Sequence, residues 1–333
     1  VEGSEAYYED IVTTLQYLAT NPININSASF DSLKMLFFLS DAQIDNILEF
    51  SKKHGAFMHP NELLLITGIG TRDLSNIKPF IRIGKYLPES ARSFYTRHEI
   101  LARMKTTRPK QAGYKKYSRD AFIYEKDYLT KKHNRFQGPP VSTLLKYKAN
   151  IGTTWQGGIT LENDAGENYF TKNQKTGFDF LSVHLCFTPN KIIQKICIGD
   201  YKIQWGQGLI AWGGFSSGKS SASLSNEKSG NGIMPYFSTD ENRFLRGGAI
   251  SLQPLRDLTT DIFVSYKKTD GNLLDADTLV SEDIQTATLY TTGYHRNELE
   301  LEKKHTLKEF TTGVSTRLNH QYFRAGIQIL HYN

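Results

Sequence analysis

The chain has 333 residues, with 40 Lys and Arg against 34 Asp and Glu, and a formal net charge of +6. This length allows a sizeable core and about two domains, while the mild basic excess falls short of a histone-like nucleic-acid partner. The mean hydropathy is −0.44, and no apolar run approaches the roughly 18 residues that a membrane helix requires. The strands of a β-barrel alternate in polarity and therefore escape that test.

The first 86 residues have the apolar spacing of helices. Residues 1–21 predict an N-terminal helix, with apolar side chains at 8, 11, 12, 15 and 18. Residues 22–86 predict a small all-helical domain, whose last helix follows the tight turn Gly68-Ile69-Gly70 and takes Thr71 as its N-cap. Short helices are expected over about 29–39, 41–54, 59–66 and 71–81. The order helix, tight turn, helix therefore occurs twice, at about 29–50 and 60–82.

A resemblance covers about 60 residues of this domain. Ile25-Asn26-Ser27-Ala28, His54-Gly55 with Phe57, and Gly68-Ile69-Gly70 make it similar to the tandem helix-hairpin-helix domain of ComEA-type DNA-binding proteins. In that family the backbone amides after the glycine turn grip a DNA phosphate without reading bases. The resemblance implies phosphate contacts at Gly68, Ile69, Gly70 and Thr71, with Arg72 and Lys78 adding salt-dependent attraction.

Two features of the same domain count against DNA. The first hairpin has Phe38 and Ser40 where the glycines would stand, and bulky residues there hinder a close phosphate. Residues 1–86 contain 7 Lys and Arg against 10 Asp and Glu, a net charge of 7 − 10 = −3, whereas a phosphate-binding module normally has a basic face. Docking onto a protein, or closure of a barrel mouth, is therefore favoured over DNA contact, which stays open as the alternative.

From about residue 98 the polarity repeats every second residue. Leu145, Tyr147 and Ile151, for example, alternate with Lys146 and Lys148. The same alternation occurs around 159–162, 181–187, 262–267, 314–318 and 323–329. This pattern predicts about nine strands, each with one apolar and one polar side.

The expected connections between these strands alternate in length. Short turns fall near 152–154, 188–195, 254–257 and 319–321, and long polar segments near 107–140, 163–176, 206–243 and 268–308. Short turns at one end and long loops at the other are typical of an outer-membrane barrel, whereas long loops are uncommon inside compact domains. The odd strand number and the ending His-Tyr-Asn lead us to expect further strands beyond Asn333. A soluble β protein is the alternative, and it requires a second sheet over the apolar side chains.

A second resemblance joins the two parts. The segments GFDFLSVHL, IGDYKIQWGQGLIAWGGFSSGKS and GIMPYFSTDENRFLRGGAISL resemble a family of large Bacteroidota proteins in which a helix-hairpin-helix domain precedes an outer-membrane-type β-barrel. The resemblance implies an α+β multidomain chain: the tandem helix-hairpin-helix domain over 22–86, and the antiparallel transmembrane β-barrel over 87–333. It also implies outer-membrane lipid around the barrel, the helical domain in the periplasm, and a signal peptide already removed before Val1. It implies no reaction, ligand or cofactor.

One motif suggests nucleotide chemistry. Gly213 to Ser220 reads GGFSSGKS and matches the phosphate-loop pattern G-x-x-x-x-G-K-[ST]. A working phosphate loop joins a buried strand of a parallel sheet to a helix. Here the following residues, SASLSNEKSGNGIMPY, carry no helical apolar stripe, and alternating strands lie on both sides. We therefore interpret the motif as a Gly/Ser-rich loop. With no convincing Ser/His/Asp set or metal-ligand spacing, we expect no enzymatic activity, cofactor or metal.

The remaining candidates lie on the polar side of the strands. Residues 87–333 carry a net charge of +6 − (−3) = +9. The basic residues expected there are Arg103, Lys105, Lys146, Lys148, Arg317 and Arg324. They either line a lumen that attracts anions or, as we favour, pair with Glu99, Glu162, Asp179 and Asp261 in an interior network.

Three further side chains, one histidine and two cysteines, are candidates for a functional or structural role. His184 is expected to make an interior polar contact rather than to bind a metal, because no second ligand stands at a suitable spacing. Cys186 and Cys197 flank a hairpin turn, and the sequence leaves open whether they are bonded.

The favoured function is a non-enzymatic outer-membrane channel or assembly scaffold, whose helical domain docks partner proteins or closes the lumen. The alternative is a DNA-uptake receptor that holds phosphate at Gly68-Ile69-Gly70.

Overall fold

A computed structural model describes residues 12, 15, 18–19, 22–28, 32–33, 35–84, 96–152, 154–170, 177–189, 192–211, 230, 232–255, 257–273, 286–319 and 323–333. The side chains of Ser27, Asp41, Leu273, Thr286, Ala287, Asn319 and Arg324 are outside this description. No helix in the described part of the chain combines the length and the apolar character needed to cross a membrane.

The N-terminal part is a small helical domain. Its elements are β1 (Ile23–Asn24), η1 (Ile25–Ser27), α3 (Asp41–His54), η2 (Pro60–Leu65), α4 (Thr71–Ile77), η3 (Lys78–Phe80) and β2 (Ile81–Arg82). α3 begins where the sequence predicts, because the Ser40 side chain accepts from the Gln43 amide and Gln43 caps in return. It ends at Gly55, whose positive φ of 87° suits glycine.

One detail of the predicted helices is wrong, and another is refined. The short helix predicted at about 59–66 is a 3-10 helix over Pro60–Leu65. Thr71 is the first residue of α4 rather than its N-cap, because extended Gly70 takes the cap position. Gly70 has no side chain to cap with, and Asp73 instead accepts the Gly70 N–H at 2.9 Å.

Apolar side chains from every helix of the domain form one core. Its fully buried members include Ile44, Ile47, Leu63 and Ile77. Asn26 ties the start of the domain to the loop after α3, donating to the Phe57 carbonyl at 2.9 Å and accepting the Phe57 N–H at 2.8 Å. β1 and β2 pair in parallel, so the first and last residues of the domain lie side by side.

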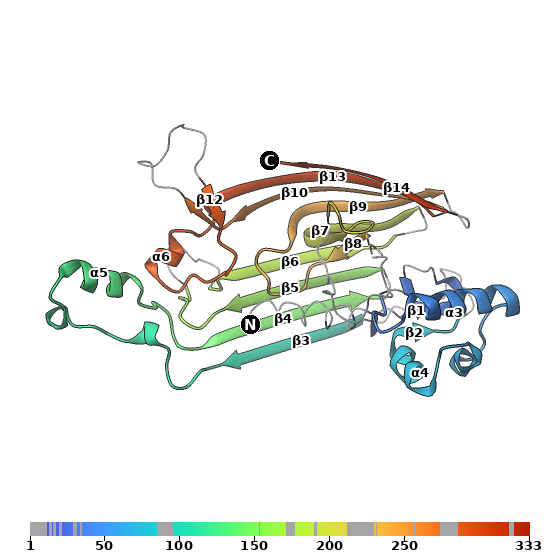
Figure 1. Cartoon of the computed structure of the whole chain (residues 1–333), viewed down its shortest axis with the longest axis horizontal. Helices are drawn as coiled ribbons and strands as arrows, with labels where there is room; N and C mark the ends of the chain where they lie inside the picture. Colours follow the sequence, from blue (N-terminus) through green and yellow to red (C-terminus); the bar gives the residue numbers. More distant parts are fainter. Residues whose placement is uncertain are drawn as a thin grey trace.

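The larger part is a ten-stranded antiparallel sheet (Figure 1). Its strands are β3 (Thr96–Lys105), β4 (Ser142–Ile151), β5 (Trp155–Asn163), β6 (Phe180–Phe187), β7 (Ile193–Gln204), β8 (Gly232–Pro235), β9 (Leu245–Leu255), β10 (Leu258–Thr269), β13 (Leu307–Asn319) and β14 (Arg324–Tyr332). The order is β14-β13-β10-β9-β7-β6-β5-β4-β3, and β8 pairs with the end of β7. Neighbours in sequence are thus mostly neighbours in the sheet, as consecutive hairpins produce.

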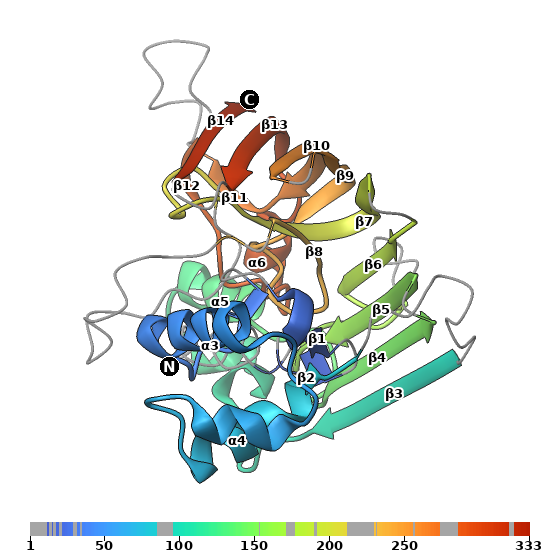
Figure 2. The ribbon, with the colours of Figure 1, turned by 90° about the vertical axis from the view of Figure 1, so that its right-hand side faces the viewer.

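The predicted barrel is confirmed only as a large antiparallel sheet. Figure 2 shows this sheet as a curved arc with β3 and β14 at its two ends. These edge strands do not pair with each other, and the described residues provide no strand beyond either of them. The sheet is therefore not closed.

The two ends of the sheet differ as the sequence predicts. Short connections join β4 to β5, β6 to β7, β9 to β10 and β13 to β14. Longer connections contain η5 (Ala112–Tyr114), η6 (Arg119–Ala121), α5 (Glu125–His133), β11 (Gly271–Leu273), β12 (Thr286–Leu289) and α6 (Glu298–Leu301). The helical domain lies at the short-turn end, opposite α5 and α6 (Figure 1).

The helical core predicts a large loss of stability for Ile44→Ala. Ile44 is fully buried, and removing a buried isoleucine side chain costs about 2–5 kcal/mol. Denaturant unfolding of the full chain, followed by helical circular dichroism, measures this change. Leu65→Ala is the matched control because Leu65 is 72% exposed, and it should shift stability by no more than about 0.5 kcal/mol. Equal losses in both variants would contradict the assigned core.

Candidate functional site

The hairpin turn, residues 66–70, is fastened to α3. Gln43 Nε2 donates to the Gly68 carbonyl at 2.7 Å, and Asn46 Nδ2 donates to the Thr67 carbonyl at 2.9 Å. Gly68 has a φ of +87°, a conformation that favours glycine. Ile69 is buried in the core of the domain. The glycines of this turn thus have a structural role whether or not a phosphate binds.

The start of α4 already holds a carboxylate. Asp73 Oδ2 accepts the Gly70 N–H at 2.9 Å, which is one of the amides that the resemblance assigns to a phosphate. A carboxylate at a helix N-terminus is itself favourable, and it opposes a second anion at the same amide. Thr71, Arg72 and Lys78 are exposed; Thr71 and Arg72 lie next to this amide, whereas Lys78 follows the end of α4.

The first hairpin uses its non-glycine residues for packing and capping. Phe38 packs against Phe80, with ring centroids 6.0 Å apart, and Ser40 is the N-cap of α3. Apolar side chains are exposed on and beside η2: Met58 is 77% and Leu65 is 72% exposed. The surface next to the hairpin turn is therefore apolar.

The large sheet has reversed polarity, apart from an apolar and aromatic cluster around Tyr201, Trp205 and Phe263 on its inner side. On its outer face, which points away from the centre of the arc, exposed apolar side chains follow one another across the strands: Ile100, Met104, Leu145, Ile159, Val183, Leu185, Ile198, Ile262, Val264, Val314, Ile327 and Ile329. On its inner face, buried polar side chains alternate with them: Lys148, Asn150, Thr160, Ser182, His184, Asp261, Ser265, Lys267, Thr311 and Ser315. The second sheet that a soluble sandwich needs is absent from the described residues.

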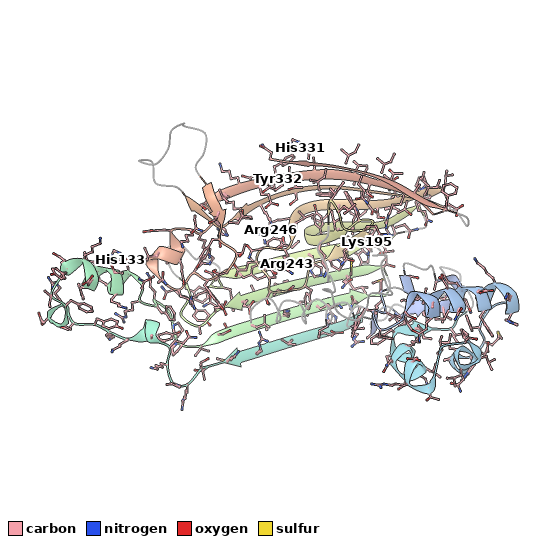
Figure 3. All side chains as sticks on the ribbon, in the orientation of Figure 1. His133, Lys195, Arg243, Arg246, His331 and Tyr332 are labelled. Atoms are coloured by element: carbon pink, nitrogen blue, oxygen red, sulfur yellow. A yellow bond between two sulfur atoms is a disulfide. The ribbon has the colours of Figure 1, made fainter. Side chains whose placement is uncertain are left out.

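Aromatic side chains lie near both ends of the outer face. Trp155 and Phe187 stack across β5 and β6 at the short-turn end, with ring centroids 4.1 Å apart. Tyr266 and Phe310 lie opposite each other on β10 and β13 at the long-loop end. His331 of β14, labelled in Figure 3, packs against Phe310.

The inner face brings some of the predicted basic residues to carboxylates. Arg317 Nη2 lies 3.2 Å from Asp261 Oδ2, which also accepts from Trp205 Nε1. Arg103 Nη2 lies 3.8 Å from Glu162 Oε1 at the exposed edge strand. These two pairs agree with the interior network that the sequence favours.

The other predicted basic residues differ in their surroundings. Lys146 Nζ lies over the Phe237 ring at 5.5 Å, Lys105 is exposed, and the Arg324 side chain is outside the described set. Lys148 is buried and has Glu99 as its cross-strand neighbour. Sequence reasoning missed Arg246 (Figure 3), whose guanidinium holds both oxygens of buried Asp200 at 2.7 and 2.8 Å.

His184, Cys186 and Cys197 are all inner-face residues. His184 is buried and makes a T-shaped ring contact with Phe237. Its hydrogen bond to the backbone of Tyr236 is an interior polar contact of the kind expected. Cys186 and Cys197 are directly paired across β6 and β7 and form a disulfide. The residues of the GGFSSGKS motif, 213–220, lie outside the described set; the strands around them, β7 and β8, pair only antiparallel.

A buried loop cluster lies at the long-loop end. Its centre is His295, whose Nδ1 is 2.5 Å from Asp179 Oδ2 and whose Nε2 is 2.9 Å from Asp270 Oδ2. Lys304 Nζ donates to Asp179 Oδ1 at 2.6 Å. Glu167 accepts the His295 N–H at 2.8 Å. One imidazole thus connects the segments before β6, after β10 and before β13.

The environment of this cluster shifts its protonation equilibria. Burial alone would lower the pKa of His295, but its hydrogen bonds to Asp179 and Asp270 and their charges outweigh burial and raise the pKa to about 10. Burial alone would raise the pKa of both aspartates, but the contacts with His295 lower them. Burial, reinforced by Asp179, raises the pKa of Glu167 to about 8. At neutral pH, His295 is therefore a cation between two carboxylates.

Two sets in this cluster have metal-ligand geometry: Glu167, Asp179 and His295, and Glu241, Asp270 and His295, each with ligand atoms within 4.8 Å of one another. Both nitrogens of the ring already face carboxylates, so a metal ion would have to displace a proton from an imidazolium. The geometry describes a buried ion network that fastens the loops. Of these residues, sequence reasoning names only Asp179 as a pairing partner, because the members are far apart in the chain and share no short spacing.

The loop cluster predicts a pH-dependent stability between pH 6.5 and 10. The raised pKa of His295 stabilises the fold fully below its unfolded value of 6.5, and this contribution is lost as pH rises through about 10. Glu167 acts in the same direction, since its neutral form is favoured up to about pH 8. The lowered pKa values of Asp179 and Asp270 add stability above their unfolded value of 3.8 that is lost only on acidification. The thermal unfolding midpoint should therefore fall by several degrees between pH 6.5 and 10.

His295→Gln is the variant that isolates the ring. It should lower the midpoint at pH 6.5 and flatten the profile up to pH 10, because no imidazolium remains to lose its proton. His133→Gln is the control, since this histidine lies on α5 with a half-exposed side chain and only a long contact, 3.7 Å from Nε2 to Glu298 Oε2 (Figure 3). Parallel profiles for the parent and His295→Gln would contradict the network.

Comparison with known families gives a match in the helical domain. Comparison with curated proteins gives no match for the chain. Residues 19–82 match the helix-hairpin-helix motif family, so this part of the chain is similar to proteins that carry that motif.

Proposed function

We propose that the large sheet is part of the wall of an outer-membrane β-barrel, and that the helix-hairpin-helix domain docks a protein partner at its short-turn end. The reversed polarity of the sheet carries this proposal. Exposed apolar surface costs about 25 cal/mol per Å² in water, and a contiguous apolar face of this kind marks an interaction surface. Buried charge on the opposite face is the arrangement expected when the outer solvent is lipid.

Strand length and aromatic placement support the same proposal. A transmembrane strand needs about 9–11 residues, and β4, β5, β9 and β14 have 10, 9, 11 and 9. Trp155 with Phe187, and Tyr266 with Phe310, lie near opposite ends of the outer face, where aromatic girdles meet the lipid headgroups. The disulfide between Cys186 and Cys197 suits an oxidising compartment such as the periplasm.

The proposal adds one requirement for the edges. Unpaired backbone groups are not tolerated in the hydrocarbon layer, so β3 and β14 must each pair with a further strand in the membrane. With short turns facing the periplasm, as in outer-membrane barrels, the helical domain lies in the periplasm. The protein in this proposal is a non-enzymatic channel or assembly scaffold.

Docking is favoured over DNA contact for three reasons. The Gly70 amide is occupied by Asp73, residues 1–86 carry a net charge of 7 − 10 = −3, and Met58 and Leu65 expose apolar surface. DNA binding remains the second candidate because the match to the helix-hairpin-helix motif family is consistent with it.

A lysine on the outer face tests the membrane proposal. Val264 is 47% exposed on β10, and a lysine near the bilayer midplane costs about 2–4 kcal/mol. Val264→Lys should therefore reduce the fraction of full-length chain that folds into lipid vesicles, measured by flotation and protease protection. Asn76→Lys adds the same charge at an exposed position of α4 and should insert like the parent. A parent chain that is monomeric without detergent and ignores vesicles would overturn the proposal.

Titration of duplex DNA against the full chain distinguishes the two uses of the helical domain. We expect no binding at physiological salt, because Asp73 competes for the Gly70 amide. Asp73→Asn removes the competing charge and is the variant most able to bind DNA. Weak DNA binding by this variant at low salt would show that the Asp73 carboxylate blocks the turn. Tight, salt-dependent binding by the parent that is lost in Gly70→Val would establish the DNA alternative instead.

A further inference from the structure

Four polar side chains on the inner face of β4, β5 and β6 are buried, and each has a donor or acceptor atom without a hydrogen-bond partner among the residues that the structure describes. The atoms are Thr160 Oγ1, Ser182 Oγ, His184 Nε2 and Asn150 Nδ2. None of these residues is more than 3% exposed. A buried polar atom without a partner costs roughly 1–3 kcal/mol, so a group of such atoms on neighbouring strands favours a polar occupant, either water or a ligand.

The strand register places these residues next to one another. Thr160 lies directly opposite Ser182. The next inward-facing row across β4, β5 and β6 consists of Lys148, Gly158 and His184. Gly158 has no side chain, and the His184 ring and Phe237 occupy the space beside its Cα. A Cβ there would overlap the His184 ring and lie 2.9 Å from Phe237 Cε2. The patch therefore has a bare backbone position at its centre, with the imidazole lying over it.

Lys148 adds a positive charge without an ion pair. It is 5% exposed, and within the described part of the chain neither an ion pair nor a hydrogen bond holds it. Its cross-strand neighbour Glu99 acts on its charge only at longer range and is held by Arg97 at 2.7 Å.

Lys267 shows how the same sheet accommodates an equally buried lysine. It is 6% exposed and donates to the carbonyls of Asn242 and Phe244 at 2.8 and 2.9 Å. It also lies 3.7 Å from Glu309. Lys148, in contrast, has no ion-pair or hydrogen-bond partner among the described residues.

We propose that Lys148, Thr160, Ser182 and His184 form a binding site for a small oxyanion of the inorganic phosphate class, with Asn150 at its border. The ammonium and the two hydroxyls donate to the anion oxygens. The other ring nitrogen of His184 is hydrogen-bonded to the backbone of Tyr236, so neutral Nε2 is an acceptor. Nε2 can take a hydrogen bond from the P–OH of a phosphate monoanion, which sulfate and chloride lack. This inference rests on burial and register, and it does not depend on whether the outer face contacts lipid.

Calorimetric titration of the full chain in detergent micelles tests the site. Sodium phosphate, sodium sulfate and sodium chloride are compared at constant ionic strength. We expect saturable binding of phosphate that is at least tenfold tighter than that of sulfate or chloride. Lys148→Met and Ser182→Ala should each weaken phosphate binding at least tenfold. Thr160→Val keeps the charge and the shape of the strand, so it reports on the site if Lys148→Met does not fold.

Lys268→Met is the matched control. Lys268 is an exposed lysine of β10, and its removal changes the net charge equally without touching the inner face. Unchanged phosphate affinity in this variant supports a specific site. Three results would overturn the proposal: no phosphate binding by the parent, equal binding of the three anions, or equal loss in Lys268→Met and Lys148→Met.

Discussion

The alternation of side chains across a pleated strand is the constraint on which the rest of this structure depends. Each strand must present one set of residues to each side, and a shift of one residue would exchange them. Here the register keeps apolar residues such as Ile159 and Val183 outside, and Thr160 and Ser182 inside, across paired strands. The inner charges can then meet partners such as Asp261 and Asp200 without crossing the sheet.

The same constraint explains how much of the fold could be predicted from the sequence. Alternation over 145–151 and 262–267 is a local pattern, so the strands and their apolar side can be predicted from it. The start of α3 is also a local feature, because Ser40 and Gln43 cap each other. Closure of the sheet depends on contacts between strands far apart in the chain, which local periodicity does not contain. The sequence predicts Thr71 as the N-cap of α4, but Gly70 takes that position, because Asp73 supplies the capping oxygen from three residues later.

The inner face and the loops show a second limit of sequence reasoning. Polar residues on alternating strands are expected to pair, but their partners are set by register and by distant loops. Arg317 reaches Asp261 as expected, whereas Lys148 has a neighbouring carboxylate that Arg97 already holds. His295 stands in a long polar segment with no marked pattern, and only folding places Asp179 and Asp270 on its two nitrogens.

The parallel pairing of Ile23–Asn24 with Ile81–Arg82 has a mechanical consequence. The two strands join residues near the start and the end of the helical segment, so this ladder closes the segment on itself. A force that separates Ile23 from Ile81 acts on this two-residue ladder before it acts on the buried core of α3 and α4.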